Sequence, residues 1–351
     1  MFSARLATLM GDPVIGAQFT DEAELQGLLA FEAALASAQA EVGLTPAASA
    51  AAIDTACNAY QPNPAQLAAG MARDGLVVPA LVAGLRASLD EPHRKWLHLG
   101  ATSQDLIDTS LILRLKTVVE ELDRRLAAII GDLDRISVTF GALPMMAQTR
   151  MQQALPSTIA ARLEAWRQPL HRHRERLIEL LPRLLAVQFG GPIGVRGGLD
   201  GKGDAVAAAL AKRLDLGNAP SWHNARDNIA ELANWLSLVS GSLGKIGQDV
   251  ALMAQNEVGA VRLAGGGTSS AMPHKNNPVA AELLVTLARF NAGLLGALHQ
   301  ALVHENERSG AAWTLEWMVL PQMCVATAAS LRHAEAMLSG LTFMAAKDSD
   351  G

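Results

Sequence analysis

The strongest constraint on this fold comes from four stretches in which apolar residues recur at alternating steps of three and four. The most regular stretch runs from Ile229 to Met253, and the others cover residues 111–136, 159–177 and 279–298. This spacing gathers the apolar side chains on one face of an α-helix, whereas a half-buried strand would repeat every two residues. Long helices with one apolar stripe each pack at shallow crossing angles, so we predict an all-α fold built on an elongated bundle.

Composition favours the same fold class. Hydrophobic residues make up 50% of the chain but aromatic residues only 4%, so aliphatic side chains and Met must fill the core. Ala and Leu are strong helix formers, whereas strands favour aromatic and β-branched residues. We expect the shorter stretches 22–42 and 46–60 to form a smaller N-terminal helical domain of residues 1–105. The long stripes place the bundle domain at residues 106–338.

Several predicted helix ends carry sequence signals. Thr102 and Asp105 have the spacing of a capping box at the start of the first long helix. Pro156 predicts the start of the next long helix, and Pro182 predicts its end. The Asn277-Pro278 pair is typical of an N-cap followed by the first helical residue.

Charge and cysteine content exclude several classes of protein. The formal net charge of −5, from 29 basic and 34 acidic residues, argues against a general affinity for nucleic acid. Cys57 and Cys324 suggest neither a disulfide framework nor a zinc knuckle, so we expect two buried thiols in a reducing compartment. The N-terminus has one Arg and an apolar stretch before Asp12 that is too short for a signal peptide, and uncharged apolar stretches such as residues 317–331 are short of a membrane span. We therefore expect a cytoplasmic protein.

Two glycine-rich loops are candidates for ligand binding. The first, residues 190–203, lacks the spacing of a phosphate-binding loop and follows no predicted strand, so we interpret it as a connector. No metal-ligand spacing is recognisable, and we expect neither a metal nor a cofactor. The second loop, residues 265–278, combines three glycines and two serines with Lys275 and Asn277. A lysine can lower the cost of ionising a nearby serine, but a flexible polar turn explains this composition equally well.

The second loop resembles the signature of the fumarase/aspartase superfamily, G-S-S-x-M-P-x-K-x-N-P. The matching residues are Ser269, Ser270, Met272, Pro273, Lys275, Asn277 and Pro278, with Thr268 in place of the Gly. Residues 98–109 (HLGATSQDLIDT) and 149–156 (TRMQQALP) resemble two further blocks of that superfamily, in the same order. The resemblance covers nearly the whole chain. It implies a homotetramer in which blocks of different subunits meet, and a C-terminal helical domain of which residues 339–351 are at most a remnant.

The second block departs from the superfamily pattern at Arg150, where members usually have a His that serves to protonate a departing amine or hydroxyl. Arginine cannot exchange a proton near neutral pH, so either the protein is inactive or its leaving group needs no proton. A carboxylate is such a group. The departure therefore points to the superfamily's 3-carboxy-cis,cis-muconate cycloisomerases, which close a small tricarboxylate to 4-carboxymuconolactone in protocatechuate degradation. Residues 187–191, 222–227 and 307–317 look like the same branch.

The resemblance also implies roles for individual residues. Ser269 is the expected proton donor to an aci-carboxylate intermediate, with Ser270 as the competing assignment. Lys275 is expected to stabilise the serine oxyanion and to pair with a substrate carboxylate. Some of the other candidates also have a purely structural interpretation: helix capping for Thr102 and Ser103, an ion pair at an interface for Arg150, and core packing for His98. The expected substrate-binding residues are His98, Thr102, Ser103, Arg150, Gln152, Ser270, Asn277 and Arg308.

Two other functions remain open. One is a lyase that forms fumarate from adenylosuccinate or argininosuccinate, and Arg150 speaks against it. The other is a non-catalytic structural oligomer, like the lens crystallins related to argininosuccinate lyase. The joint presence of Ser269, Lys275 and Asn277 speaks against that alternative. Neither alternative involves nucleic acid or a membrane.

Overall fold

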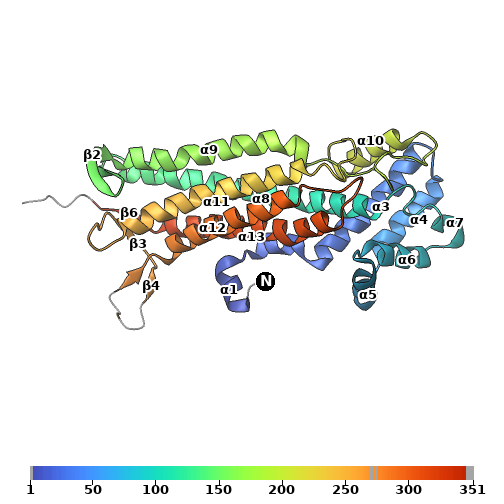
Figure 1. Ribbon diagram of the computed structural model, residues 1–351, viewed down its shortest axis with the longest axis horizontal. Helices are drawn as coiled ribbons and strands as arrows, with labels where there is room; N and C mark the ends of the chain where they lie inside the picture. Colours follow the sequence, from blue (N-terminus) through green and yellow to red (C-terminus); the bar gives the residue numbers. More distant parts are fainter. Residues whose placement is uncertain (1–2, 269–271, 273–274, 345–351) are drawn as a thin grey trace, which may run out of the picture.

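The computed structural model describes residues 3–268, 272 and 275–344, and these residues confirm the predicted all-α fold class. Long helices lie side by side and form an elongated bundle (Figure 1). They are α8 (Ser103–Phe140), α9 (Ile159–Leu184), α11 (Asp227–Met253), α12 (Val279–Gln300) and α13 (Ala311–Ser339). Each predicted stripe therefore lies on a helix of the bundle.

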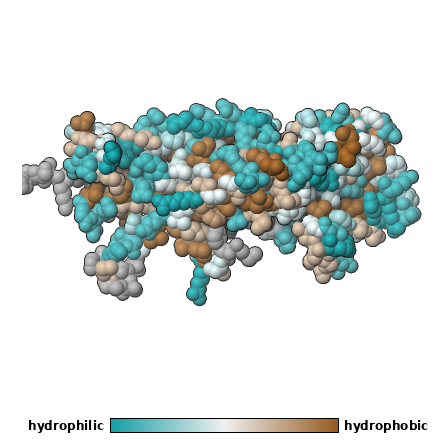
Figure 2. All heavy atoms as spheres, in the orientation of Figure 1, coloured by the Kyte–Doolittle hydropathy of each residue, from teal (hydrophilic) through white to brown (hydrophobic). Residues whose placement is uncertain are grey.

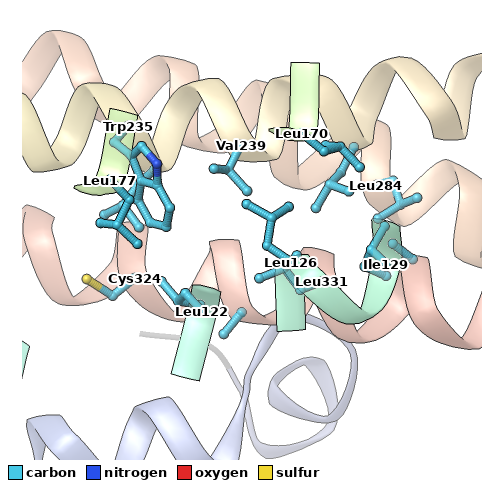
Figure 3. Packing of buried hydrophobic residues seen from close by; sticks show 14 of the residues in the cluster. Leu122, Leu126, Ile129, Leu170, Leu177, Trp235, Val239, Leu284, Cys324 and Leu331 are labelled. Carbon is cyan, nitrogen blue, oxygen red and sulfur yellow. The ribbon is translucent and has the colours of Figure 1, made fainter. Parts of the chain in front are cut away.

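The apolar stripes face the centre of the bundle. Figure 3 shows Leu122 and Leu126 of α8 packed among Leu170 of α9, Val239 of α11 and Leu331 of α13. All five side chains are almost completely removed from water. Because each buried aliphatic side chain contributes about 1.5–3 kcal/mol, these stripes are the main source of stability for the bundle.

The N-terminal part packs around a second cluster of buried apolar side chains at one end of the bundle. Its helices are α3 (Asp21–Glu41), α4 (Ala47–Ala59), α5 (Pro64–Asp74), α6 (Val78–Ser88) and α7 (Glu91–Arg94). The later helix α10 (Gly203–Leu214) packs in the same cluster. Gly27 of α3 lies against Ser110 of α8, and a Cβ at this glycine would come within 2.3 Å of the Ser110 hydroxyl. Glycine therefore lets α3 pack directly on α8. The chain begins with α1 (Ala4–Met10), α2 (Pro13–Gly16) and the 3-10 helix η1 (Ala17–Phe19).

Three short two-stranded antiparallel sheets lie at the opposite end of the bundle (Figure 1). The pairs are β1 (Pro144–Thr149) with β2 (Gln152–Thr158), β3 (Val261–Leu263) with β6 (Leu341–Phe343), and β4 (Gly267–Thr268) with β5 (Asn276–Asn277). Phe343 packs against Phe140 at the end of α8, with ring centroids 6.1 Å apart. This contact fixes the β3–β6 pair to the end of α8 that is remote from the N-terminal helices.

Some predicted helix ends are wrong by a few residues. Pro156 lies in β2, because the hairpin ladder continues to Thr158, which is the N-cap of α9. Pro182 lies inside the last turn of α9, where a missing N–H removes only one hydrogen bond and the helix still reaches Leu184. Asn277 pairs in β5, so α12 begins only after Pro278.

Two other local predictions are confirmed. Thr102 and Asp105 form a capping box at the start of α8. Cys57 and Cys324 are buried free thiols. Both predictions concern short-range or single-residue properties that depend little on the rest of the fold.

Helix α12 is apolar but poorly covered. Among the described helices it is the one that meets the length and hydropathy expected of a membrane span, a criterion that core helices of soluble proteins also meet. Only 28% of its apolar window is buried. Figure 2 shows apolar patches over the middle of the bundle, whereas the edge formed by α9 is hydrophilic. The single chain therefore leaves apolar surface uncovered along the bundle.

Candidate active site

The three sequence blocks lie at two different ends of the bundle. Residues 98–102 lead into α8 beside the N-terminal helices, whereas the β1–β2 hairpin follows α8 at its other end (Figure 1). Helix α8 has 38 residues, and at 1.5 Å per residue it spans about 57 Å. Of the third block, the described residues 265–268 and 275–278 lie at the same end as the hairpin, and the latter lead into α12. The first block therefore cannot meet the other two within one chain.

Asp105 organises the first block from inside. Its buried carboxylate accepts hydrogen bonds from the backbone N–H groups of Thr102 at 3.0 Å, Gly190 at 2.8 Å and Gly191 at 2.9 Å. Nε2 of His223 lies 2.8 Å from the same carboxylate. These contacts tie the start of α8 to the 188–191 and 221–223 loops. Because its oxygens are occupied and buried, Asp105 holds the block in place and does not face a ligand.

Arg226 bridges two buried carboxylates one turn further along α8. Its guanidinium donates to Asp108 at 2.6 and 3.1 Å and to Glu316 at 2.8 and 2.6 Å. Burial raises the pKa of Glu316, but the neighbouring His304 and Arg226 outweigh it and hold that pKa below its usual value. Attraction to Asp108 and Glu316 likewise outweighs burial and raises the pKa of Arg226. Arg226 and Glu316 are therefore charged, and the cluster of Arg226, Glu316 and Asp108 joins α8, α11 and α13.

Three predicted substrate-binding residues surround this buried scaffold. Thr102 is the N-cap of α8, and Ser103 is its first residue, and both are partly exposed. A helix N-terminus presents unpaired backbone N–H groups and the positive end of the helix dipole, so it favours an anion. Arg308 donates to the carbonyl of Pro192 at 3.0 Å, beside the loop that Asp105 holds. It also lines an open cavity of about 820 Å³ together with Trp313 and other residues.

His98 is held in an uncommon backbone conformation. Its φ is 62°, which is left-handed, and its side chain remains 16% exposed. Nδ1 lies 2.6 Å from Oε1 of Glu32, a carboxylate on α3 that is almost fully buried. His98, Thr102 and Ser103 of the first block thus lie at the same end of the molecule as Arg308.

The second block lies in the β1–β2 hairpin, where Arg150 and Met151 form a two-residue turn. Their φ values are 49° and 67°. Two successive left-handed residues are typical of a type I′ turn, which favours Asn and Gly, and other residues are strained there by about 1–2 kcal/mol each. The turn presents Arg150 and Gln152 to solvent. Backbone strain of this kind is concentrated at functional sites.

The third block approaches α12 through the β4–β5 pair. Asn277 lies opposite Gly267 and is partly buried, and Lys275 is exposed with its N–H bonded to the carbonyl of Met272 at 2.9 Å. Within the described part of the chain, neither Lys275 nor Arg150 forms an ion pair. The expected proton donors, Ser269 and Ser270, lie outside the described residues.

Sequence reasoning missed the buried partners of the first block. Glu32 and His98 are 66 positions apart, and Asp108 and Arg226 are 118 positions apart, so no local pattern reveals either contact. A signal for Glu32 was present, because it is a charged residue on the face of α3 that buries Leu28 and Leu35. Among residues 3–268, 272 and 275–344, no group of three or more His, Cys, Asp or Glu side chains is arranged to hold a metal.

Comparisons with known proteins agree on the family. A family model described as a lyase matches residues 10–291. The 3-carboxy-cis,cis-muconate cycloisomerase of Pseudomonas aeruginosa is 42% identical over 336 residues, which cover 93% of this chain and 72% of that protein. The 3-carboxy-cis,cis-muconate lactonizing enzyme of Pseudomonas putida has a TM-score of 0.91 at 38% identity, over 97% of this chain and 78% of that one. A fumarate lyase from Mesorhizobium sp. BNC1 has a TM-score of 0.90 at 32% identity, over 98% and 78%. The chain therefore belongs to this lyase family, the fumarase/aspartase superfamily.

Proposed function

We propose that this chain is a cycloisomerase that closes 3-carboxy-cis,cis-muconate to 4-carboxymuconolactone. The observation that carries the proposal is Arg150, a permanent cation at the strained tip of the hairpin where superfamily members usually have a proton-exchanging His. The similarity to proteins named as cycloisomerases, at 38–42% identity over most of the chain, supports the same reaction.

The proposed reaction suits a site with fixed cations. One carboxylate of the trianion forms a C–O bond to an alkene carbon within the same molecule. The electron pair of the double bond moves to the carbon α to another carboxylate, and this aci-carboxylate takes up one proton. The net charge falls from three negative charges to two, and no leaving group needs a proton. An arginine can therefore hold a carboxylate bidentately here without having to exchange a proton.

The chain's own residues supply the two main catalytic effects. Thr102 and Ser103 at the α8 N-terminus bind one carboxylate, so that the nucleophile and the alkene are held in an attack geometry. Lys275 and Arg150 stabilise the negative charge that develops, and Asn277 and Gln152 add hydrogen bonds to the substrate. Ser269 delivers the proton, with Ser270 as the alternative donor. His98 and Arg308 complete the anion site at the first block.

The distance along α8 supports a site that is shared between copies of the chain. Since the first block lies about 57 Å from the hairpin along that helix, the site combines ends of different subunits. The uncovered apolar window of α12 supplies a surface for this assembly. We propose a cytoplasmic homotetramer with shared sites that uses no cofactor and acts on a small tricarboxylate.

The direct test of the reaction is a spectroscopic assay. Purified protein given 3-carboxymuconate made from protocatechuate should remove the diene absorbance, and Ser269→Ala should slow that loss strongly. An unchanged absorbance with the wild type would contradict the proposed reaction, and release of fumarate from adenylosuccinate or argininosuccinate would support a lyase instead. A full rate in Ser269→Ala would overturn only the serine assignment, and Ser270→Ala would then be the informative variant.

The assembly is tested by one pair of matched substitutions. Gly293 on α12 and Gly131 on α8 are exposed helical glycines, and a Cβ at either would meet none of the described atoms within 4 Å. Gly293→Arg should therefore leave the protomer folded but disrupt the tetramer in light scattering, with loss of activity. Gly131→Arg, on the charged face of α8, should leave both unchanged. A tetramer that survives Gly293→Arg would contradict the role of α12.

A further inference from the structure

We propose that Glu32 is a positioning residue of the active site that acts through His98. The inference rests on the proposed function in one respect, namely that the first block meets the substrate. Its physical basis is a contact between α3 and the loop that leads into α8, which joins a buried carboxylate to a partly exposed imidazole.

Helix α3 holds this loop at two points. Glu32 contacts His98, and Gln39 donates from Nε2 to the carbonyl of Leu99 at 2.7 Å. The two residues are seven positions apart, so they lie two turns apart on the same face of the helix. Glu32 is 1% exposed and Gln39 is completely buried. The helix therefore fixes both the backbone of the loop and the ring of His98.

The arrangement is costly for the fold. Oε2 of Glu32 is buried without a hydrogen-bond partner among the described residues, so this carboxylate depends on His98 alone. Removing a carboxylate from water is unfavourable unless its oxygens are paired. Leu28, Phe31 and Leu35 of the same helix are buried in the N-terminal core, where a leucine in place of Glu32 would fit the surroundings better. Costs of this kind persist where function requires them.

The contact decides which atom of His98 faces the site. An ionised carboxylate only accepts hydrogen bonds, so Nδ1 carries the proton and donates to Glu32. Nε2 is then the ring atom available to a ligand, and it has no hydrogen bond within the part of the chain that the structure describes. Glu32 thus holds the ring of His98 so that Nε2, a hydrogen-bond acceptor in the neutral ring, faces the site and can take part in the proton transfer.

Two substitutions separate positioning from packing. Glu32→Leu removes the acceptor, and we expect kcat/KM for 3-carboxymuconate to fall at least about 10-fold, the loss typical of removing a partner that orients a ligating histidine. Glu32→Gln keeps an acceptor for Nδ1–H and should lose clearly less. The urea midpoint of Glu32→Leu should stay equal or rise, because an incompletely paired buried charge is removed. A lower midpoint with unchanged kcat/KM would show a structural role and overturn the proposal.

A double-mutant cycle tests whether Glu32 acts through His98. In a His98→Gln background, Glu32→Leu should cause no further loss of kcat/KM, whereas fully additive losses would overturn the coupling. Glu41→Leu is the matched control, since Glu41 is an exposed residue of the same helix that pairs with Arg213 at the surface. Its kcat/KM should equal that of the wild type.

The ring nitrogens provide a readout that does not depend on turnover. In ¹⁵N NMR of histidine-labelled protein, the neutral ring of His98 should carry its proton on Nδ1 in the wild type and in Glu32→Gln, but not predominantly in Glu32→Leu. A proton on Nε2 in the wild type would overturn the proposal. Wild-type protein that fails to convert 3-carboxymuconate would contradict the proposed function, while the NMR result would still decide the Glu32–His98 contact.

Discussion

The two ends of the bundle differ in how their charged groups are paired. At the start of α8, Asp108, Arg226 and Glu316 are buried and bonded to one another. At the other end, Arg150 and Lys275 are exposed and form no ion pair among the residues described. The buried charges of the first end are paired within one chain, whereas the cations of the second end have no ion-pair partner among the described residues. The partner that we propose for these cations is a substrate with several carboxylates, bound at an interface between copies of the chain.

The two ends of the bundle also differ in how strained backbone conformations are supported. The hairpin turn places two non-glycine residues, Arg150 and Met151, in left-handed conformations on an exposed tip. The single left-handed non-glycine residue of the first block, His98, is instead stabilised by contacts with α3. Substitutions in the buried Asp108–Arg226–Glu316 cluster should therefore change stability most, and substitutions of the exposed cations at the second end should change activity most.

The largest expected effect on stability is at Arg226. Arg226→Met leaves the carboxylates of Asp108 and Glu316 buried without their main partner, and breaking such a cluster costs about 3–5 kcal/mol of unfolding free energy. Urea denaturation measures the loss. Arg183→Met is the control, because the Arg183–Glu231 pair is exposed and such pairs contribute about 1 kcal/mol or less. Equal losses in the two variants would contradict the scaffold role of the buried cluster.

The next effect concerns the exposed cations of the second end. Lys275→Met and Arg150→Met should each lower kcat/KM for 3-carboxymuconate by about 100- to 1,000-fold, the range found when one fixed donor to a developing charge is removed. Urea midpoints should match the wild type, because both side chains are exposed. Steady-state kinetics and denaturation on the same preparations check this. A variant that loses stability but keeps its activity per folded molecule would contradict the prediction that these cations act in catalysis and not in the fold.

A smaller effect, on the pH dependence of stability, is expected at His173 of α9, which lies between the two ends of the bundle. Burial, together with the nearby Arg176, lowers the pKa of His173 to about 4. Its ring contacts Ser242 at 2.8 Å, while Trp235 donates to its backbone carbonyl at 2.7 Å. The unfolded chain binds this proton more readily, with a pKa of about 6.5. The stability that the neutral ring contributes is therefore present above pH 6.5 and is lost as the pH falls toward 4.

The His173→Gln variant tests the source of that loss. Its melting temperature should fall less than that of the wild type between pH 6.5 and pH 4.5, as measured by circular dichroism. The difference should be similar in the Lys275→Met background, since the two residues lie in separate parts of the molecule. An identical pH dependence in His173→Gln and the wild type would assign the acid sensitivity to other groups.

Local patterns explain which features could be predicted from the sequence. The stripe from Ile229 to Met253 predicted α11 because helical periodicity depends on neighbouring residues only. The capping box of Thr102 and Asp105 succeeded for the same reason. The β1–β2 hairpin was not predicted, because the Arg150-Met151 turn lacks the Asn-Gly signal of a type I′ turn.

The candidate site likewise has parts that the sequence could predict and parts that it could not. The three blocks were found through their resemblance to a superfamily, and the structure then shows that they lie at two ends of the bundle. Long-range contacts such as Glu32 with His98 and Asp108 with Arg226 join residues that are far apart in the sequence, so single-chain pattern reasoning does not reach them. The roles of Ser269 and Lys275 remain predictions that the kinetic experiments address.

Complementation between inactive variants tests most directly whether the two ends form one site across subunits. Arg150→Met changes only the second end, and a Thr102→Ala/Ser103→Ala double variant changes only the first, so each should be nearly inactive alone. After the two are unfolded together and refolded, about a quarter of the sites should combine two intact ends and recover activity toward 3-carboxymuconate. If the refolded mixture forms mixed oligomers but stays as inactive as its parents, the claim that the site is shared between chains is wrong.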